Sequence, residues 1–354
     1  MFSGTKCCLF LLVLIICTFT YGQTESSFYP DSLDVYIFNE TDHLWNTFGK
    51  DIWPGYKPAE LPVLLYRSPG LHWLMDHPSP PGSFTALDFL NTTFYIYNLP
   101  ESPLWSHFSA TIWPINGVWT TILPSSQAWL EFCRGHNIPE KYYPPDQLVM
   151  IALHERFHAY QIQWLEPDFK NIFELDDFSK SSEIKIDSLL LLTKNSPVAV
   201  LCLEEQKALY NAYQEKDPEK SKQYIKQFTG LREKRAALMS NKQRQAENYM
   251  ELVEGIAKYL EIRLAMALQE PYTPIKAMNS HNSFRAYQNA KQAPLTFIDN
   301  VRDGDLTDNR VYSTGSVICL LLDRFSGTDW KHNIFSNYQS QKINLVDLLK
   351  QTIR

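Results

Sequence analysis

The sequence predicts an α+β protein in which an N-terminal mixed α/β region with a small sheet precedes a mostly helical C-terminal region. Between residues 24 and 145 the apolar runs are short, rich in aromatic residues and bounded by Pro, Gly and Ser, which is typical of strands. From residue 146 to residue 354 the apolar residues recur with helical spacing. With 44% hydrophobic and 20% charged residues among 354, the chain is globular and can bury one large or two modest cores.

Residues 1–23 are expected to form a signal peptide. Lys6 precedes an apolar run over residues 7–16, which is too short to span a bilayer but has the length of a signal-peptide core. Cleavage after Gly22 or Gln23 fits the small or uncharged residues there, and an uncleaved anchor is the alternative. We therefore expect a secreted or periplasmic protein with no membrane span after signal removal. The net charge of -6 gives no general attraction to nucleic acid.

Several segments of residues 24–145 predict regular structure. Residues 34–50 have the pattern of one helix, and residues 62–66, 71–75 and 93–97 each have the composition of a strand. Asn116 and Gly117 predict a two-residue hairpin turn between strands at 110–115 and 118–123, because both residues tolerate positive φ. Pro114 lacks an N–H and suits an edge strand. The strand at 118–123 is expected to offer an edge to an extended peptide.

The region from residue 146 onward predicts consecutive helices. Asp146 is expected to cap a helix that ends near Trp164. Further helices are expected near residues 184–192, 198–215 and 219–239. The basic residues between 216 and 244 are interleaved with acidic ones, which predicts a solvent-exposed helix face instead of a binding patch.

One pentapeptide carries the strongest chemical signal. His154-Glu155-Arg156-Phe157-His158 has the HExxH pattern inside the first helix of this region. Residues four apart share a helix face, so His154 and His158 can offer imidazole nitrogens to one metal ion, with Glu155 beside its bound water. The flanking residues are largely apolar, as a buried metal helix requires. The alternative is a surface helix with two chance histidines, in which Glu155 would face water.

A catalytic zinc ion takes three protein ligands and leaves one position for water, so a third ligand is needed. The best candidates lie in residues 251–261, ELVEGIAKYLE. The HExxH pattern followed by Glu-Gly-x-Ala-x-Tyr-x-Glu resembles the gluzincin branch of zinc metallopeptidases, and the aminopeptidase N family carries a similar string. This resemblance implies a zincin-like fold, Zn²⁺ as cofactor and Glu254 as the third ligand. Glu251, one turn earlier, remains an alternative ligand or an acceptor for an imidazole N–H.

Three further positions bear on this resemblance. Gly255 has no side chain, so the HExxH helix is expected to pack closely against the helix that carries Gly255. Arg156 places a charge where zincin helices normally have an uncharged residue. Lys258 replaces an acidic residue that some gluzincins have one turn after the ligand.

A hydrolase of this type also needs a donor for the oxyanion that develops on the scissile carbonyl. The resemblance implies a Tyr or His downstream of the Glu ligand. Tyr312, at the start of an apolar helix over residues 316–325, is the first candidate, and His281 is the second. A core aromatic with a satisfied hydroxyl is the alternative for Tyr312. Arg310 either binds a substrate carboxylate or, by default, lies on the surface.

These residues together predict a secreted zinc-dependent metallopeptidase that acts on peptide or protein substrates. Zinc held by His154, His158 and Glu254 lowers the pKa of a bound water, and Glu155 takes its proton so that hydroxide attacks the carbonyl. Glu155 then protonates the leaving amine. Two alternatives stay open: a non-catalytic zinc site closed by Glu251 as fourth ligand, and a metal-free interaction module with an accidental HExxH.

Overall fold

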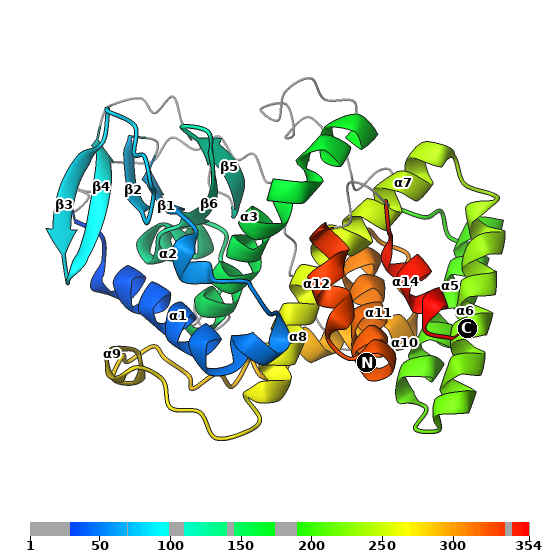
Figure 1. Cartoon of the computed structure of the whole chain (residues 1–354). Helices are drawn as coiled ribbons and strands as arrows, with labels where there is room; N and C mark the ends of the chain where they lie inside the picture. The colour runs from blue at the N-terminus through cyan, green and yellow to red at the C-terminus, as the bar shows by residue number, and fades with distance from the viewer. Residues whose placement is uncertain are drawn as a thin grey trace.

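The computed structural model describes residues 29–68, 70–98, 110–139, 145–173, 190–336 and 342–353. The expected signal peptide and most of the helix expected at 184–192 lie outside the described residues. The α+β class is confirmed, with a small mixed sheet toward the N-terminus followed by helices (Figure 1). None of the helices in these ranges has both the length and the apolar character that crossing a membrane requires.

Six strands form one sheet in the order β3-β4-β2-β1-β6-β5. Neighbouring strands are antiparallel except for the parallel pair of β1 and β6, so the sheet is mixed. Strand β3 was not predicted, because its mostly exposed side chains give no apolar run. The strand bounds are β1 (Val63–Ser68), β2 (Leu71–Met75), β3 (Thr85–Phe89), β4 (Thr92–Asn98), β5 (Thr111–Ile115) and β6 (Val118–Pro124).

The predicted hairpin between β5 and β6 is confirmed. Asn116 and Gly117 have φ of 47° and 76°, and Ile115 pairs with Val118. Pro114 lies on β5, an edge strand, as predicted. The expectation that residues 118–123 offer an edge to a peptide is wrong, because β6 pairs with β1 on one side and β5 on the other. The edge strands of the described sheet are β3 and β5.

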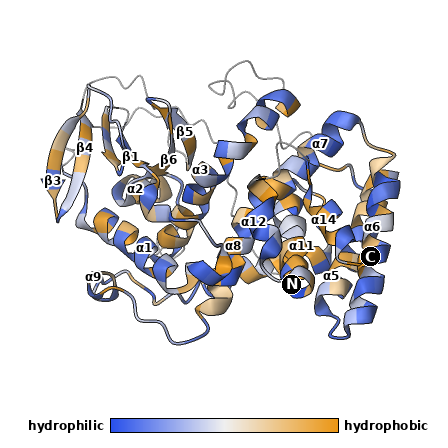
Figure 2. Cartoon of the chain, in the orientation of Figure 1, coloured by the Kyte–Doolittle hydropathy of each residue, from blue (hydrophilic) through white to orange (hydrophobic). Residues whose placement is uncertain are grey.

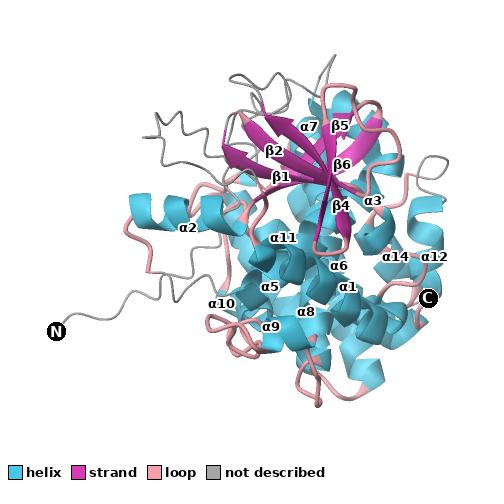
Figure 3. Cartoon of the chain, turned by 90° about the vertical axis from the view of Figure 1, so that its left-hand side faces the viewer, coloured by secondary structure: helices cyan, strands magenta, loops and turns pink. Residues whose placement is uncertain are grey.

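Helix α1 (Ser32–Ile52) confirms the helix predicted over residues 34–50 and covers one face of the sheet. It begins at the N-cap Asp31, whose carboxylate accepts a hydrogen bond from the backbone N–H of Leu33. Val35 and Phe38 on its inner face belong to the same buried cluster as the β2 residue Trp73. Figure 3 shows the twisted strands fanned out above the helices.

Helix α3 (Pro145–Phe173) crosses the same face and continues into the helical region (Figure 1). It begins at Pro145, whose fixed φ suits the first helical position, so Asp146 lies inside the helix and does not cap it. The helix also runs past the expected end at Trp164 and includes Pro167. Ala152 of α3 belongs to the buried cluster beneath the sheet, and Ile151 of the same helix packs against it.

The helical region confirms the helices predicted near 198–215 and 219–239 as α5 and α6, which pack against each other. In Figure 2 hydrophobic and hydrophilic residues alternate along peripheral helices such as α6, as expected where only one face is buried. The remaining bounds are η1 (Pro58–Glu60), α2 (Ser126–Gly135), α5 (Pro197–Gln214), α6 (Pro218–Ala236), α7 (Asn241–Met250), η4 (Glu251–Gly255), α8 (Ile256–Ala267), α9 (Lys276–Asn279), η5 (Ala293–Leu295), α10 (Thr296–Asp303), α11 (Arg310–Ser326), α12 (Asp329–Ser336) and α14 (Leu345–Gln351).

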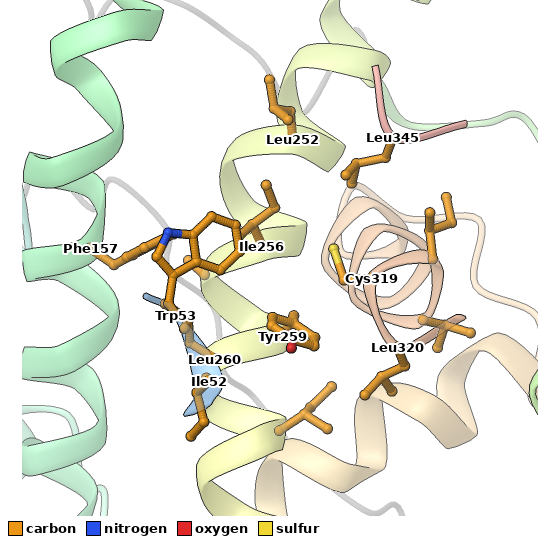
Figure 4. Packing of buried hydrophobic residues seen from close by; sticks show 14 of the residues in the cluster. Ile52, Trp53, Phe157, Leu252, Ile256, Tyr259, Leu260, Cys319, Leu320 and Leu345 are labelled. Atoms are coloured by element: carbon orange, nitrogen blue, oxygen red, sulfur yellow. The ribbon is translucent and has the colours of Figure 1, made fainter. Parts of the chain in front are cut away.

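The largest core joins α1 and α3 to the helices of the C-terminal region. The Trp53 ring, which has no exposed surface, contacts Phe157 of α3 edge-on and lies near Tyr259 of α8 (Figure 4). Ile52 from α1 and Cys319 from α11 belong to the same cluster. The helix that carries HExxH is therefore held on one side by the sheet and on the other by α8.

A second feature of the helical region is a buried cluster of three arginines and three glutamates. The predicted solvent-exposed basic face is wrong for Arg232 and Arg235 of α6, which are 6% and 1% exposed. Arg310, expected at the surface, is 2% exposed. The sequence shows alternating charges, but only the packing of α5, α6, α7, η4 and α11 shows that these charged side chains pair with one another in the interior. The ion pairs join Arg232 to Glu205 and Glu251, Arg235 to Glu205 and Glu247, and Arg310 to Glu247.

Candidate metal centre

His154, His158 and Glu254 meet where α3 lies against the continuous run of α7, η4 and α8. The Nε2 atoms of His154 and His158 lie 3.4 Å and 3.2 Å from Oε2 of Glu254. The three ligand atoms all lie within 4.8 Å of one another. Within the described ranges this is the one group of His, Cys, Asp or Glu side chains with metal-ligand spacing.

The three converging atoms suit a cation of the size of Zn²⁺. Each is buried and, apart from contacts within this group of three, has no hydrogen-bond partner in the part of the chain that the structure describes. Zinc bonds of about 2.0–2.2 Å in a tetrahedron place ligand atoms roughly 3.3–3.6 Å apart, close to the separations of 3.4 Å and 3.2 Å between the two imidazoles and Glu254. Buried polar atoms without partners are costly, so a cation between them would satisfy all three at once.

The ring orientation of His154 is fixed by a carboxylate behind it. Nδ1 of His154 lies 2.5 Å from Oε1 of Glu261, and Nζ of Lys258 lies 2.7 Å from the same oxygen. Although burial opposes ionisation, Lys258 and His154 lower the pKa of Glu261 to about 2. An ionised carboxylate only accepts, so in the neutral ring Nδ1 carries the proton and Nε2 presents its lone pair to the centre.

The ring of His158 is fixed by an amide. Nε2 of Gln161 donates to the backbone oxygens of Leu252 and Val253, at 3.3 Å and 3.0 Å. Carbonyl oxygens only accept, so this contact identifies the amide nitrogen and turns Oε1 of Gln161 toward Nδ1 of His158, 2.8 Å away. His158 therefore also carries its proton on Nδ1 and presents Nε2.

The carboxylates of Glu254 and Glu261 favour positive charge at the centre. Burial lowers the pKa of His154, but Glu254 and Glu261 outweigh burial and raise it to about 9. The two imidazoles likewise hold the pKa of Glu254 well below its usual range, against the effect of burial. A divalent cation would replace the protons that these carboxylates otherwise attract to the rings.

Glu155 lies one residue round the helix from His154 and is 1% exposed. Its Oε1 has no hydrogen-bond partner among the described residues. Burial raises the pKa of Glu155, and the neighbouring imidazoles of His158 and His154 oppose that rise. A carboxyl group whose pKa is raised by burial suits a role in accepting and returning a proton.

A small pocket of about 30 Å³ lies beside these side chains. Tyr312, in the first turn of α11, lines it together with His154 and Glu155, and its ring lies 6.5 Å from the His154 ring. Burial, Glu254 and Glu155 raise the pKa of Tyr312, so its hydroxyl stays protonated and can donate. His281, in the turn after α9, does not line this pocket. The other lining residues are Ile151, Lys258, Glu261, Phe297 and Asn309.

Glu251 and Gly255 differ from their expected roles. Glu251 does not contact the imidazoles, because Arg232 holds its carboxylate through two hydrogen bonds of 2.9 Å and 2.7 Å. The carboxylate that accepts a hydrogen bond from an imidazole N–H is that of Glu261, which contacts Nδ1 of His154. Gly255 allows a close approach of α11, not of α3, since a Cβ there would lie 2.6 Å from the Cα atom of Gly315.

Arg156 and Lys258, the two charged residues that depart from the gluzincin pattern, both have partners that stabilise their charge. Arg156, 1% exposed, pairs with Asp42 at 3.1 Å and donates to the backbone oxygen of Leu61. Lys258 pairs with Glu261 and lies over the ring of Phe297. Sequence reasoning missed Gln161 and the role of Glu261. Their positions three residues after His158 and seven after Glu254 are compatible with contact, but helix spacing alone does not identify them.

Comparisons of the chain with protein-family models, with curated proteins and with solved structures give no match.

Proposed function

We propose that the protein is a zinc-dependent metallopeptidase of gluzincin type with a zincin-like fold. The observation that carries the proposal is the convergence of three buried, unpartnered ligand atoms, from His154, His158 and Glu254, next to the buried carboxyl group of Glu155. The HExxH spacing supplies two of these ligands, and η4 supplies the third.

In the proposed chemistry, Glu155 transfers the proton and Tyr312 donates a hydrogen bond. Zinc, when bound, supplies a Lewis acid that brings the pKa of a water molecule near 7. Glu155 accepts the proton of that water and returns it to the leaving amine. Tyr312 donates a hydrogen bond to the oxyanion that forms on the substrate carbonyl. Its raised pKa supports this role, because only the protonated hydroxyl donates.

Catalysis is favoured over a closed structural site by the number of ligands. A structural zinc site has four protein ligands, whereas a catalytic site has three and an open position. Glu251, the expected fourth ligand of the alternative, is occupied by Arg232. Within the described residues, no fourth His, Cys, Asp or Glu belongs to the group.

The wider assignment also belongs to this proposal. We assign residues 24–145 to an N-terminal α/β region and residues 146–354 to a helical catalytic region. Export to the periplasm or the exterior follows from the apolar run at residues 7–16. The substrates are peptides or proteins, and nucleic acid is not a partner.

Cleavage of a mixed peptide library, with and without a chelator, tests the proposal. The wild-type protein loaded with one zinc ion should cleave peptides, and chelation should stop cleavage. Glu155→Gln should keep the zinc but lose turnover by at least about 100-fold, the scale of general acid–base catalysis. Undiminished activity in that variant would refute the role of Glu155.

A further inference from the structure

Gln161 contacts both the helix that carries the two histidines and the segment that carries Glu254, although it is not one of the three candidate ligands. Its Oε1 accepts from the Nδ1–H of His158 on its own helix. Its Nε2 donates to the backbone oxygens of Leu252 and Val253, the two residues that precede Glu254. The side chain is 1% exposed, so water does not compete for these contacts.

The segment that Gln161 holds is a π-helical turn. Residues Glu251–Gly255 form η4, between the α-helices α7 and α8. A π turn adds one residue to a helical turn and changes where the following side chains point, and such turns recur at functional sites. Glu254 lies inside this turn, so the direction of its carboxylate depends on the turn being kept.

We propose that Gln161 is a positioning residue that couples His158 to Glu254, so that metal affinity depends on an amide that binds no metal. One side chain fixes the tautomer of the first ligand and the backbone that carries the second. The inference rests on the metal centre of the proposed function and adds to it the residue that aligns two of its ligands.

The amide is required for both contacts at once, which distinguishes it from other side chains of similar size. Glutamate keeps an acceptor for His158 but brings a carboxylate against two carbonyl oxygens, and the donor contacts are lost. Methionine keeps the approximate volume but offers neither an N–H donor nor a strong acceptor. The two substitutions therefore separate the effect on His158 from the effect on the π turn.

The test measures Zn²⁺ and Co²⁺ dissociation constants by chelator competition in the full chain. Gln161→Met should weaken binding by roughly 10- to 100-fold, the usual effect of losing a partner behind a metal ligand. Gln161→Glu should also weaken binding, because it disrupts η4. Gln163→Met, an exposed glutamine on the same helix, is the matched control and should bind as the wild type does.

Three readouts separate positioning from a general loss of structure. The visible absorption of bound Co²⁺ should change in the Gln161 variants, because ligand geometry changes. The affinity lost by Gln161→Met should be smaller in a His158→Ala background, where only the contacts of Gln161 with the η4 backbone remain to be lost. Zn²⁺ should also raise the melting temperature less in the Gln161 variants than in the wild type, measured against each apo form.

The outcomes distinguish this inference from the proposed function. Unchanged metal affinity in Gln161→Met, or tighter binding in Gln161→Glu, overturns the coupling. A wild-type protein that binds zinc but cleaves no peptide overturns the peptidase and leaves the coupling supported by the affinities. A wild-type protein that binds neither ion overturns both.

Discussion

Gly255 and Gly315 lie backbone to backbone where η4 crosses α11. A Cβ on Gly315 would lie 2.5 Å from the backbone oxygen of Glu251, and one on Gly255 would lie 2.6 Å from Cα of Gly315. Neither distance is available to a real Cβ atom, so the two helices approach this closely only because both residues are glycine. The crossing therefore holds the π turn against α11.

Gly255→Ala should therefore separate η4 from α11. We expect a loss of about 1–3 kcal/mol in the free energy of unfolding, the usual effect of overpacking, together with weaker zinc binding because Glu254 moves with the turn. Denaturant unfolding and a zinc titration measure the two effects. Gly230→Ala on α6, where a Cβ would meet nothing within 4 Å, is the control and should stabilise the protein by up to about 1 kcal/mol.

Glu254 and Glu251 should respond differently to neutral substitution. Glu254→Gln removes a proposed ligand, and zinc affinity should fall by more than about 100-fold, beyond the effect of an outer partner. Glu251→Gln should still bind one zinc ion but lose about 3 kcal/mol of stability, because Arg232 remains buried without its bidentate partner. Zinc titration and urea unfolding of both variants check this. The reverse pattern would make Glu251 the ligand.

Glu261→Gln should weaken zinc binding without removing a ligand. The amide no longer supplies the charge that both His154 and Lys258 contact. We expect affinity to fall by about 10- to 100-fold. Glu60→Gln, in an exposed ion pair with Lys57, is the control and should leave zinc binding unchanged. Equal affinities for the two variants would contradict the role of Glu261.

Asp34 makes stability depend on pH. Burial, opposed by the hydrogen bond from the backbone N–H of Ser126, raises the pKa of Asp34 from 3.8 to about 6. The folded protein binds the extra proton between these values, so this residue lowers stability as pH rises through that window, and the full cost is present above pH 6. Asp34→Asn lacks this dependence.

The stability difference between Asp34→Asn and the wild type should therefore shift in favour of the variant by about 2–3 kcal/mol from pH 4 to pH 8. Unfolding in urea at both pH values measures it. Asp88→Asn, a substitution at an exposed residue of β3, should show no comparable shift. A constant difference for Asp34→Asn across this range would mean that the carboxyl group is not buried as described.

The features that the sequence predicts correctly are those set by residues close to one another along the chain. Asn116-Gly117 specifies its own turn, and the spacing of His154 and His158 places both on one helix face whatever surrounds them. The α+β division followed from the change in apolar period near residue 145. Glu254 was identified only through the resemblance, because nothing within its own helix distinguishes it from Glu251.

The remaining features depend on tertiary packing. Strand β3 lacks an apolar run and exists because β4 pairs with it. Arg232 and Arg235 have the spacing of exposed residues, and their burial depends on glutamates from α5, α7 and η4. Gln161 has ordinary surroundings in the sequence, and its role depends on α3 lying against η4.

Anomalous diffraction at the zinc edge, on crystals of the zinc-loaded protein, tests the central claim most directly. We predict one peak about 2.0–2.2 Å from Nε2 of His154, Nε2 of His158 and the carboxylate of Glu254, with the fourth position held by solvent. A zinc-loaded crystal with no peak between these atoms, or with a fourth protein ligand completing the coordination, would contradict the proposed catalytic centre.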